Sequence, residues 1–208
     1  MREMDECGCG SWLGRTLLDG VEEVIGRTGV YAVTNLARMT DTGELRALDG
    51  RESKPVYRDL VMIQRALEDM YGLRGGCGIL MRAGRACFKH VLQQYGLPMG
   101  ITELSYRLMP APTRLKIGLE AMARQFSILM ETRVILEEQE SKWLWRVEDC
   151  PFCYKRSAEE SLCSFTVGLL QEFLAWASAG RVYSVWEVEC AATGQPACIL
   201  QIDKQPLD

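Results

Sequence analysis

The apolar residues of the N-terminal half recur every three or four positions, which is the spacing of one face of an α-helix. We expect helices over residues 17–25, 30–39, 56–71, 73–96 and 113–129, with a polar, turn-rich loop over residues 40–55. Gly78 and Gly84 lie inside the fourth of these helices. A glycine in a helix interior costs stability, so both positions indicate close packing against another backbone.

The period of the pattern then changes from helical to alternating. Apolar and polar residues alternate over two stretches that predict a pair of strands, and Trp143, Trp145 and Val147 share one face of the second. A further helix closes at Gly180 and is followed by two more strands. The fold class is therefore α+β: a helical N-terminal half, then two antiparallel β-hairpins separated by a helix. The expected bounds are 132–139 and 142–148 for the first hairpin, 158–179 for the helix, and 182–189 and 197–203 for the second hairpin.

Composition excludes several classes of partner. The 208 residues carry a net charge of −4 without any basic run, which argues against a nucleic-acid partner. No stretch approaches the roughly 18 consecutive apolar residues of a membrane span. The acidic N-terminus is unlike a signal peptide. We expect a cytoplasmic protein whose thiols are reduced or metal-bound.

Five of the nine cysteines fall between residues 150 and 198. Glu187 and Cys190 precede a Gly-Gln-Pro turn and Cys198 follows it. Residues on either side of a hairpin loop face each other at roughly 4.5–5.5 Å between Cβ atoms, so two thiolates placed there can share one zinc ion. Together with Cys163, these residues form a candidate metal site.

A second cysteine pair leaves the ligand set open. Cys150 and Cys153 stand in a Cys-Pro-Phe-Cys sequence just before Cys163. They are alternative zinc ligands, in place of Glu187 and Cys163. A redox-active pair of the thioredoxin kind would need a βαβ context, and the pattern here does not supply one.

The C-terminal motif resembles the signature of the 4-vinyl reductase, or hydrocarbon-binding, domain. The residues that carry the resemblance are Cys163-x4-Gly168 and Glu187-x2-Cys190-x3-Gly194-x3-Cys198-x-Leu200. That domain occurs in bacteriochlorophyll 4-vinyl reductase accessory proteins and in the sensor halves of phenol- and toluene-responsive activators. Its fold is similar to that of the TRAPP vesicle-tethering subunits.

The resemblance implies a ligand set, a pocket and a domain division. Zinc, rather than iron, would be held by Cys163, Glu187, Cys190 and Cys198, as in the phenol sensors. The hydrocarbon-binding domain would span residues 54–208 and enclose a long apolar pocket, with residues 1–53 as a helical element that serves in dimerisation. The related domains tend to pair, and the apolar stripes of residues 17–25 and 30–39 also favour a homodimer.

No catalytic set is visible in the sequence. The single histidine has no G-x-S-x-G elbow beside it, and there is neither a phosphate loop nor a dinucleotide fingerprint. We therefore expect a binding protein that holds a small hydrophobic or aromatic ligand rather than an enzyme. The alternatives are an accessory protein or reductase of bacteriochlorophyll (tetrapyrrole) synthesis, and a homodimeric scaffold without a ligand. The candidate ligand-binding residues are Met81, Arg85, His90, Met122, Phe126, Trp143 and Trp145.

Overall fold

The computed structural model describes residues 12–40 and 55–207. Two long helical segments come first, α1 (Trp12–Thr40) and α2 (Pro55–Tyr95). Each bends at one glycine with a positive φ, which is 74° at Gly26 and 72° at Gly72. The expected breaks between helices at these glycines are thus confirmed. Cys7, Cys9, most of the expected polar loop and the expected boundary between residues 53 and 54 lie outside the described residues.

Helix α2 lies between α1 and α5 (Ser164–Ala177) and packs closely against both. A Cβ atom on Gly84 would overlap the carbonyl oxygen of Phe165 in α5. The expectation of backbone contact at Gly84 is therefore confirmed. The same expectation for Gly78 is wrong, because within the described ranges no atom outside its own stretch of helix lies within 4 Å of a Cβ built there.

The apolar face of α1 packs inside this chain, with part of its residues fully buried and part half-buried. Leu17, Val21 and Val33 have no exposed side-chain surface and belong to the main core cluster, which joins α1 to α2. An amphipathic helix is satisfied once its apolar face is covered. The stripes from which we expected a homodimer therefore need no partner chain.

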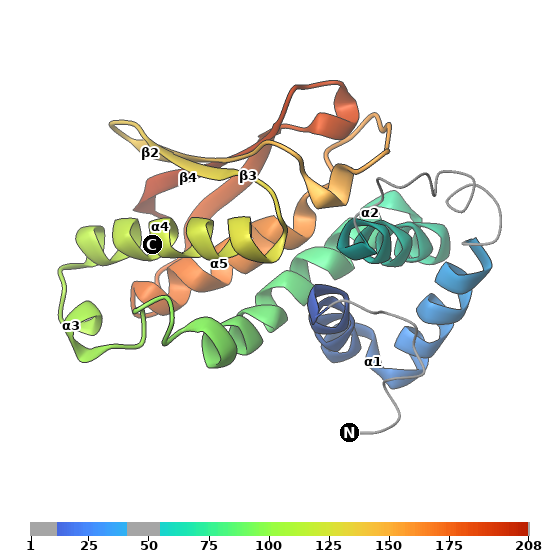
Figure 1. The fold of residues 1–208 in the computed structure, drawn as a ribbon, viewed down its shortest axis with the longest axis horizontal. Coiled ribbons are helices and arrows are strands. Elements are labelled where there is room, and N and C mark those ends of the chain that lie inside the picture. The colour runs from blue at the N-terminus through green and yellow to red at the C-terminus, as the bar shows by residue number, and fades with distance from the viewer. Residues whose placement is uncertain (1–11, 41–54, 208) are drawn as a thin grey trace.

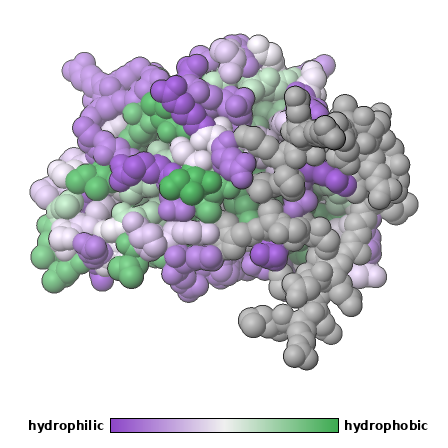
Figure 2. Space-filling model, viewed as in Figure 1, coloured by the Kyte–Doolittle hydropathy of each residue, from purple (hydrophilic) through white to green (hydrophobic). Residues whose placement is uncertain are grey.

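After α2 the chain turns through the short helix α3 (Leu104–Arg107) into α4 (Ala111–Leu129). Three leucines of this turn are 70–75% exposed, namely Leu97, Leu104 and Leu108. Figure 2 shows apolar surface at the corner where Figure 1 places α3. The hydrophobic pattern did not predict α3, because the turn buries only two larger apolar residues, Ile101 and Tyr106.

The two expected hairpins form, and they join into one four-stranded antiparallel sheet of order β1-β2-β4-β3. The joint is the pairing of β2 with β4, in which Trp145 faces Leu200 and Val147 faces Cys198. The α+β class is confirmed. The strands are β1 (Val134–Glu138), β2 (Lys142–Val147), β3 (Tyr183–Glu189) and β4 (Cys198–Pro206).

Helices α4 and α5 cover one face of the sheet (Figure 1). Trp143, Trp145 and Val147 point into this layer, as the alternating pattern predicted. On the opposite face Trp186 and Val188 are 39% and 46% exposed. Within the described ranges, no helix has the length and apolar character needed to cross a membrane.

The expected start of the last helix at Ala158 is wrong, since α5 begins at Ser164. The intervening residues form a loop that the tertiary structure holds. The N–H of Ala158 donates to the carbonyl of Ala192, and the side chain of Gln64 in α2 donates to the carbonyl of Leu162. These contacts fix the backbone in a non-helical path up to Cys163, the N-cap of α5.

Candidate functional site

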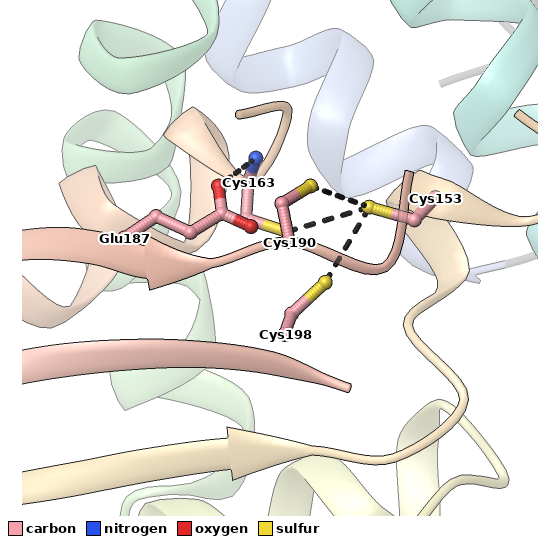
Figure 3. A group of neighbouring side chains, drawn as sticks. All are labelled: Cys153, Cys163, Glu187, Cys190 and Cys198. Atoms are coloured by element: carbon pink, nitrogen blue, oxygen red, sulfur yellow. Dashed lines mark hydrogen bonds between the residues drawn. The ribbon is translucent and has the colours of Figure 1, made fainter. Parts of the chain in front are cut away.

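Three segments bring ligating side chains together at one end of the sheet (Figure 3). The 3₁₀ turn η4 (Pro151–Cys153) supplies Cys153, and the N-terminus of α5 supplies Cys163. The hairpin of β3 and β4 supplies Glu187 from β3, Cys190 from the connection and Cys198 from the start of β4. The ligand atoms of these five residues all lie within 4.8 Å of one another. We call these five residues the thiol cluster.

Cys153 contacts the three other thiols of the cluster. Its Sγ is 3.5 Å from the Sγ atoms of Cys190 and Cys198 and 3.8 Å from that of Cys163. Four thiolates around one tetrahedral zinc, with bonds of about 2.3 Å, have sulfurs about 3.8 Å apart. The three distances from Cys153 are close to this value, and the remaining pairs lie within 4.8 Å, so the spacing is compatible with one tetrahedral ion.

Glu187 lies beside the sulfurs and also binds the backbone of Cys163. Its Oε2 accepts a hydrogen bond of 2.8 Å from the backbone N–H of Cys163, while its buried Oε1 has no hydrogen-bond partner among the residues that the structure describes. Burial raises the pKa of the Glu187 carboxyl. A carboxylate in this position orients Cys163 and has one oxygen left for an ion or a proton.

Cys150 is the nearest thiol outside the cluster. Its Sγ lies 3.4 Å from that of Cys163, yet it is not part of the mutually close set. The structure thus brings together all four residues of the expected tetrad and the alternative ligand Cys153. It places the other alternative, Cys150, beside them.

The close thiols shift one another's pKa values in different directions. Hydrogen bonds with other thiols, that of Cys150 foremost, lower the pKa of Cys153. The pKa of Cys163 is raised by its hydrogen bonds with neighbouring thiols, first that of Cys150. Packed thiols cannot all ionise unless a cation compensates their charge, so this arrangement suits a cation.

Helix α2 anchors the loops that carry the cysteines. The hydroxyl of Tyr57 donates to the carbonyls of Met130, at 2.7 Å, and Asp149, at 3.2 Å. The guanidinium of Arg156 binds both carboxylate oxygens of Glu68 at 3.0 and 2.6 Å, and both side chains are nearly buried. Sequence reasoning missed these anchors, because single polar residues on a helix carry no motif.

The seven candidate ligand-binding residues do not share one pocket. Four of them lie in the layer between α4 and the sheet, where the ring centroids of Phe126 and Trp145 are 5.7 Å apart. The other three belong to α2 and face different helices. Arg85 donates to the side chain of Gln171 in α5, and His90 faces Glu23 in α1, at 3.7 Å between Nε2 and Oε1. The four residues in the layer are Met122, Phe126, Trp143 and Trp145, and Met81 packs at the crossing of α2 with α5.

Two donors in the layer between α4 and the sheet are buried without a partner. Among the described residues, no acceptor binds the indole Nε1 of Trp143 or that of Trp145. Their side chains are 3% and 0% exposed. Trp143 also lines a cavity of about 640 Å³ that lies at the end of the sheet opposite the thiol cluster. The layer therefore presents unpaired hydrogen-bond donors among apolar side chains.

Comparison with known proteins confirms the resemblance in the C-terminal part. The family model of the 4-vinyl reductase domain matches residues 143–204, a stretch that includes all five residues of the thiol cluster. No curated protein sequence matches the chain.

Solved structures with the same fold include one sensory domain and several H-NOX proteins. The phenol-responsive sensory domain of the transcription activator PoxR, solved with phenol, is 18% identical, with a TM-score of 0.52 over 69% of this chain and 72% of that one. An Fe(II) H-NOX protein from K. algicida is 11% identical, with a TM-score of 0.55 over 93% and 95% of the two chains. An H-NOX protein from S. oneidensis is 13% identical, with a TM-score of 0.55 over 93% and 98%. At these identities the likeness establishes the fold.

Proposed function

We propose that this protein binds a small hydrophobic or aromatic molecule between α4 and the sheet, as a sensor or carrier. The observation that carries the proposal is the pair of unpartnered indole donors of Trp143 and Trp145 in an apolar layer. A buried donor without an acceptor costs about 1–3 kcal/mol, and a native structure rarely keeps two side by side without use. A bound ligand with a hydroxyl or carbonyl oxygen supplies the missing acceptor.

The fold supports the same proposal. The sensory domain of PoxR, which has this fold, was solved with phenol. Phenol combines an aromatic ring with one polar oxygen, the chemistry that an indole N–H among apolar side chains would select. We extend this ligand class to the present chain because its own donors favour it.

Isothermal titration calorimetry of the full chain against phenols, fatty acids and porphyrins tests the proposal. We expect at least one class to bind. We also expect Trp143→Phe, which keeps a ring but removes the donor, to weaken binding about 2- to 12-fold, as the loss of one hydrogen bond implies. Trp186→Phe, on the opposite face, is the matched control. Failure of all three classes would leave the homodimeric scaffold as the remaining function, and porphyrin binding alone would favour the role in tetrapyrrole synthesis.

The thiol cluster has a structural role in this proposal. We infer that Cys153, Cys163, Cys190 and Cys198 bind one zinc ion, with Glu187 orienting Cys163 through its backbone N–H. Four protein ligands leave no open position for a substrate, so the ion would stabilise the fold rather than catalyse a reaction. A cytoplasmic location would keep these thiols reduced. Elemental analysis of protein purified without chelator distinguishes zinc, iron and no metal.

A further inference from the structure

The end of the sheet remote from the thiol cluster is open and basic. The cavity of about 640 Å³ lies where the first turn of α4 meets the ends of β1, β2 and β4. Trp143 and Tyr183 provide its aromatic wall, and Lys116, Arg181 and Lys204 provide its positive charge. Glu138 is the acidic residue among its lining side chains. Three cations and one carboxylate give the cavity a local charge of +2 in a chain whose net charge is −4.

The two lysines already hold an anion, whereas the arginine does not. Lys116 Nζ and Lys204 Nζ lie 2.6 and 2.8 Å from the two carboxylate oxygens of Glu138. These hydrogen bonds lower the pKa of Glu138 to about 2, so it is ionised at neutral pH. In the described part of the chain, no ion pair involves Arg181, which is exposed beside the cavity. Arg181 is therefore available for a second anion.

The first turn of α4 adds backbone donors to the same cavity. Ala111 and Thr113 line it. Their backbone N–H groups belong to the first turn of a 19-residue helix, where N–H groups have no carbonyl partner within the helix. The N-cap residue, Pro110, makes no side-chain capping hydrogen bond. The N-terminal end of a helix of this length favours negative charge.

Trp143 links the basic mouth to the apolar interior. Among the described residues its buried indole Nε1 has no partner, and Lys204 Nζ lies 5.2 Å from the centroid of its ring. A ligand that enters through the mouth passes the cations and then meets the ring of Trp143 and the apolar wall.

We propose that the ligand is an amphipathic carboxylate, an aromatic or aliphatic acid whose apolar part lies against Trp143 and Tyr183. Its carboxylate would be held at the mouth by Arg181, Lys204 and the first turn of α4. A planar carboxylate matches the two parallel N–H groups of an arginine. The proposal rests on the proposed ligand-binding function, and it names the class of ligand.

Glu138 makes the site adjustable. It pairs with Lys204, which an incoming carboxylate would also use, so the two anions compete. Removing the charge of Glu138 should tighten the binding of an acid, and removing that of Arg181 should weaken it.

Titration calorimetry with ligands of one carbon skeleton tests the proposal on the full, metal-loaded chain. The ligands are 3-phenylpropionate, its primary amide and 3-phenylpropanol. We expect the acid to bind about tenfold more tightly than both neutral compounds, as a hydrogen bond to a charged group implies. Its affinity should fall severalfold as sodium chloride rises from about 0.05 to about 0.5 M, because screening weakens exposed charges.

Two variants and a control assign the effect to the cavity. Arg181→Gln should weaken the acid about tenfold and leave the neutral compounds unchanged. Glu138→Gln should strengthen the acid severalfold. Arg133→Gln makes the same change of charge as Arg181→Gln at the other end of β1, where Arg133 pairs with Glu148, and should have no effect.

The outcomes separate this inference from the function on which it rests. Equal binding of the acid, amide and alcohol would overturn the carboxylate proposal and support the apolar pocket. Tighter binding of phenyl phosphate than of the acid would also overturn it. Binding of none of these compounds, nor of the phenols, fatty acids and porphyrins, would refute the proposed function itself.

Discussion

Replacing Cys153 by serine is the sharpest test of the thiol cluster. Cys153 Sγ lies within 3.5–3.8 Å of three other sulfurs. If the ion lies among these four sulfurs, the substitution removes a thiolate ligand and substitutes a hydroxyl that rarely ionises at neutral pH. The metal affinity should then fall by more than the roughly 10- to 100-fold that follows the loss of an outer hydrogen-bond partner.

The loss of metal affinity sets the loss of stability, because metal binding to the folded state adds to the free energy of unfolding. A 100-fold loss of affinity, at a metal concentration well above both dissociation constants, removes about 2.7 kcal/mol from the free energy of unfolding. For a chain of this size, each kcal/mol shifts the melting temperature by roughly 2–4 °C, so Cys153→Ser should melt about 5–11 °C lower. Without metal, the difference from the wild type should be much smaller.

Calorimetric melting with and without zinc, together with a competition titration of zinc against a chelator, measures both quantities. Cys77→Ser is the matched control, because Cys77 is a half-buried thiol on α2 outside the thiol cluster. Cys150→Ser should retain the ion, and Glu187→Gln should weaken it only as an outer partner does. The reasoning is refuted if Cys153→Ser keeps full affinity while Glu187→Gln releases the ion, since the ligands would then be Cys163, Glu187, Cys190 and Cys198. Release by both Cys150→Ser and Cys153→Ser, with Cys163→Ser tolerated, would identify the Cys-Pro-Phe-Cys pair with Cys190 and Cys198.

Three further predictions concern packing, pH and assembly. Gly84→Ala should lower the free energy of unfolding by about 1–3 kcal/mol, because its Cβ meets the backbone of α5. Gly78→Ala, where the space is open, should raise it by roughly 0.5–1 kcal/mol. Denaturant titration measures both changes. The lowered pKa of Glu138 means that its ion pairs stabilise the fold above the ordinary value of 4.5 and lose this effect as the pH falls towards about 2, so the stability difference between wild type and Glu138→Gln should shrink over this range. We also expect a homodimer in sedimentation at micromolar concentration, with an interface outside the buried stripe of α1; a monomer there would contradict this.

Local signals in the sequence were sufficient for most of the fold. Glycines that follow an apolar periodic stretch marked the bends at Gly26 and Gly72, and strict alternation marked the buried face of β2. The start of α5 was missed, because residues 158–163 have helix-compatible composition but bond to the loop at Ala192 and to Gln64. Contacts between distant segments decided that boundary, and periodicity contains no information about them.

The positions of the ligand-binding candidates could not be predicted for a related reason. Periodicity shows that a helix has an apolar face but not which neighbour covers it. Met81, Arg85 and His90 belong to α2, which lies between α1 and α5. The basic residues of the cavity, Lys116, Arg181 and Lys204, are single charges from three elements, and no local motif joins them.

Spacing could identify pairs of cysteines but not the ligand set, because the pairs come from separate segments. Cys190 with Cys198, and Cys150 with Cys153, are each set by a local turn. The relation of one pair to the other depends on the anchoring of the η4 loop to α2 through Tyr57 and the Glu68–Arg156 ion pair. That anchoring places Cys153 against Cys198, the first residue of β4. Strand β4 then continues to the cavity at the other end of the sheet.

Strand β4 begins at Cys198, passes Leu200 opposite Trp145 and Ile202 opposite Trp143, and reaches Lys204 at the cavity. A one-residue shift of its register would turn the thiol away from the cluster and the lysine away from the cavity together, because side chains alternate between the faces of a sheet. The register of β4 that places Cys198 in the thiol cluster therefore also determines which of its side chains line the cavity. The proposed metal centre and the proposed ligand pocket are two ends of one structural element, which is why a purely structural ion at one end would belong to a binding protein whose function resides at the other.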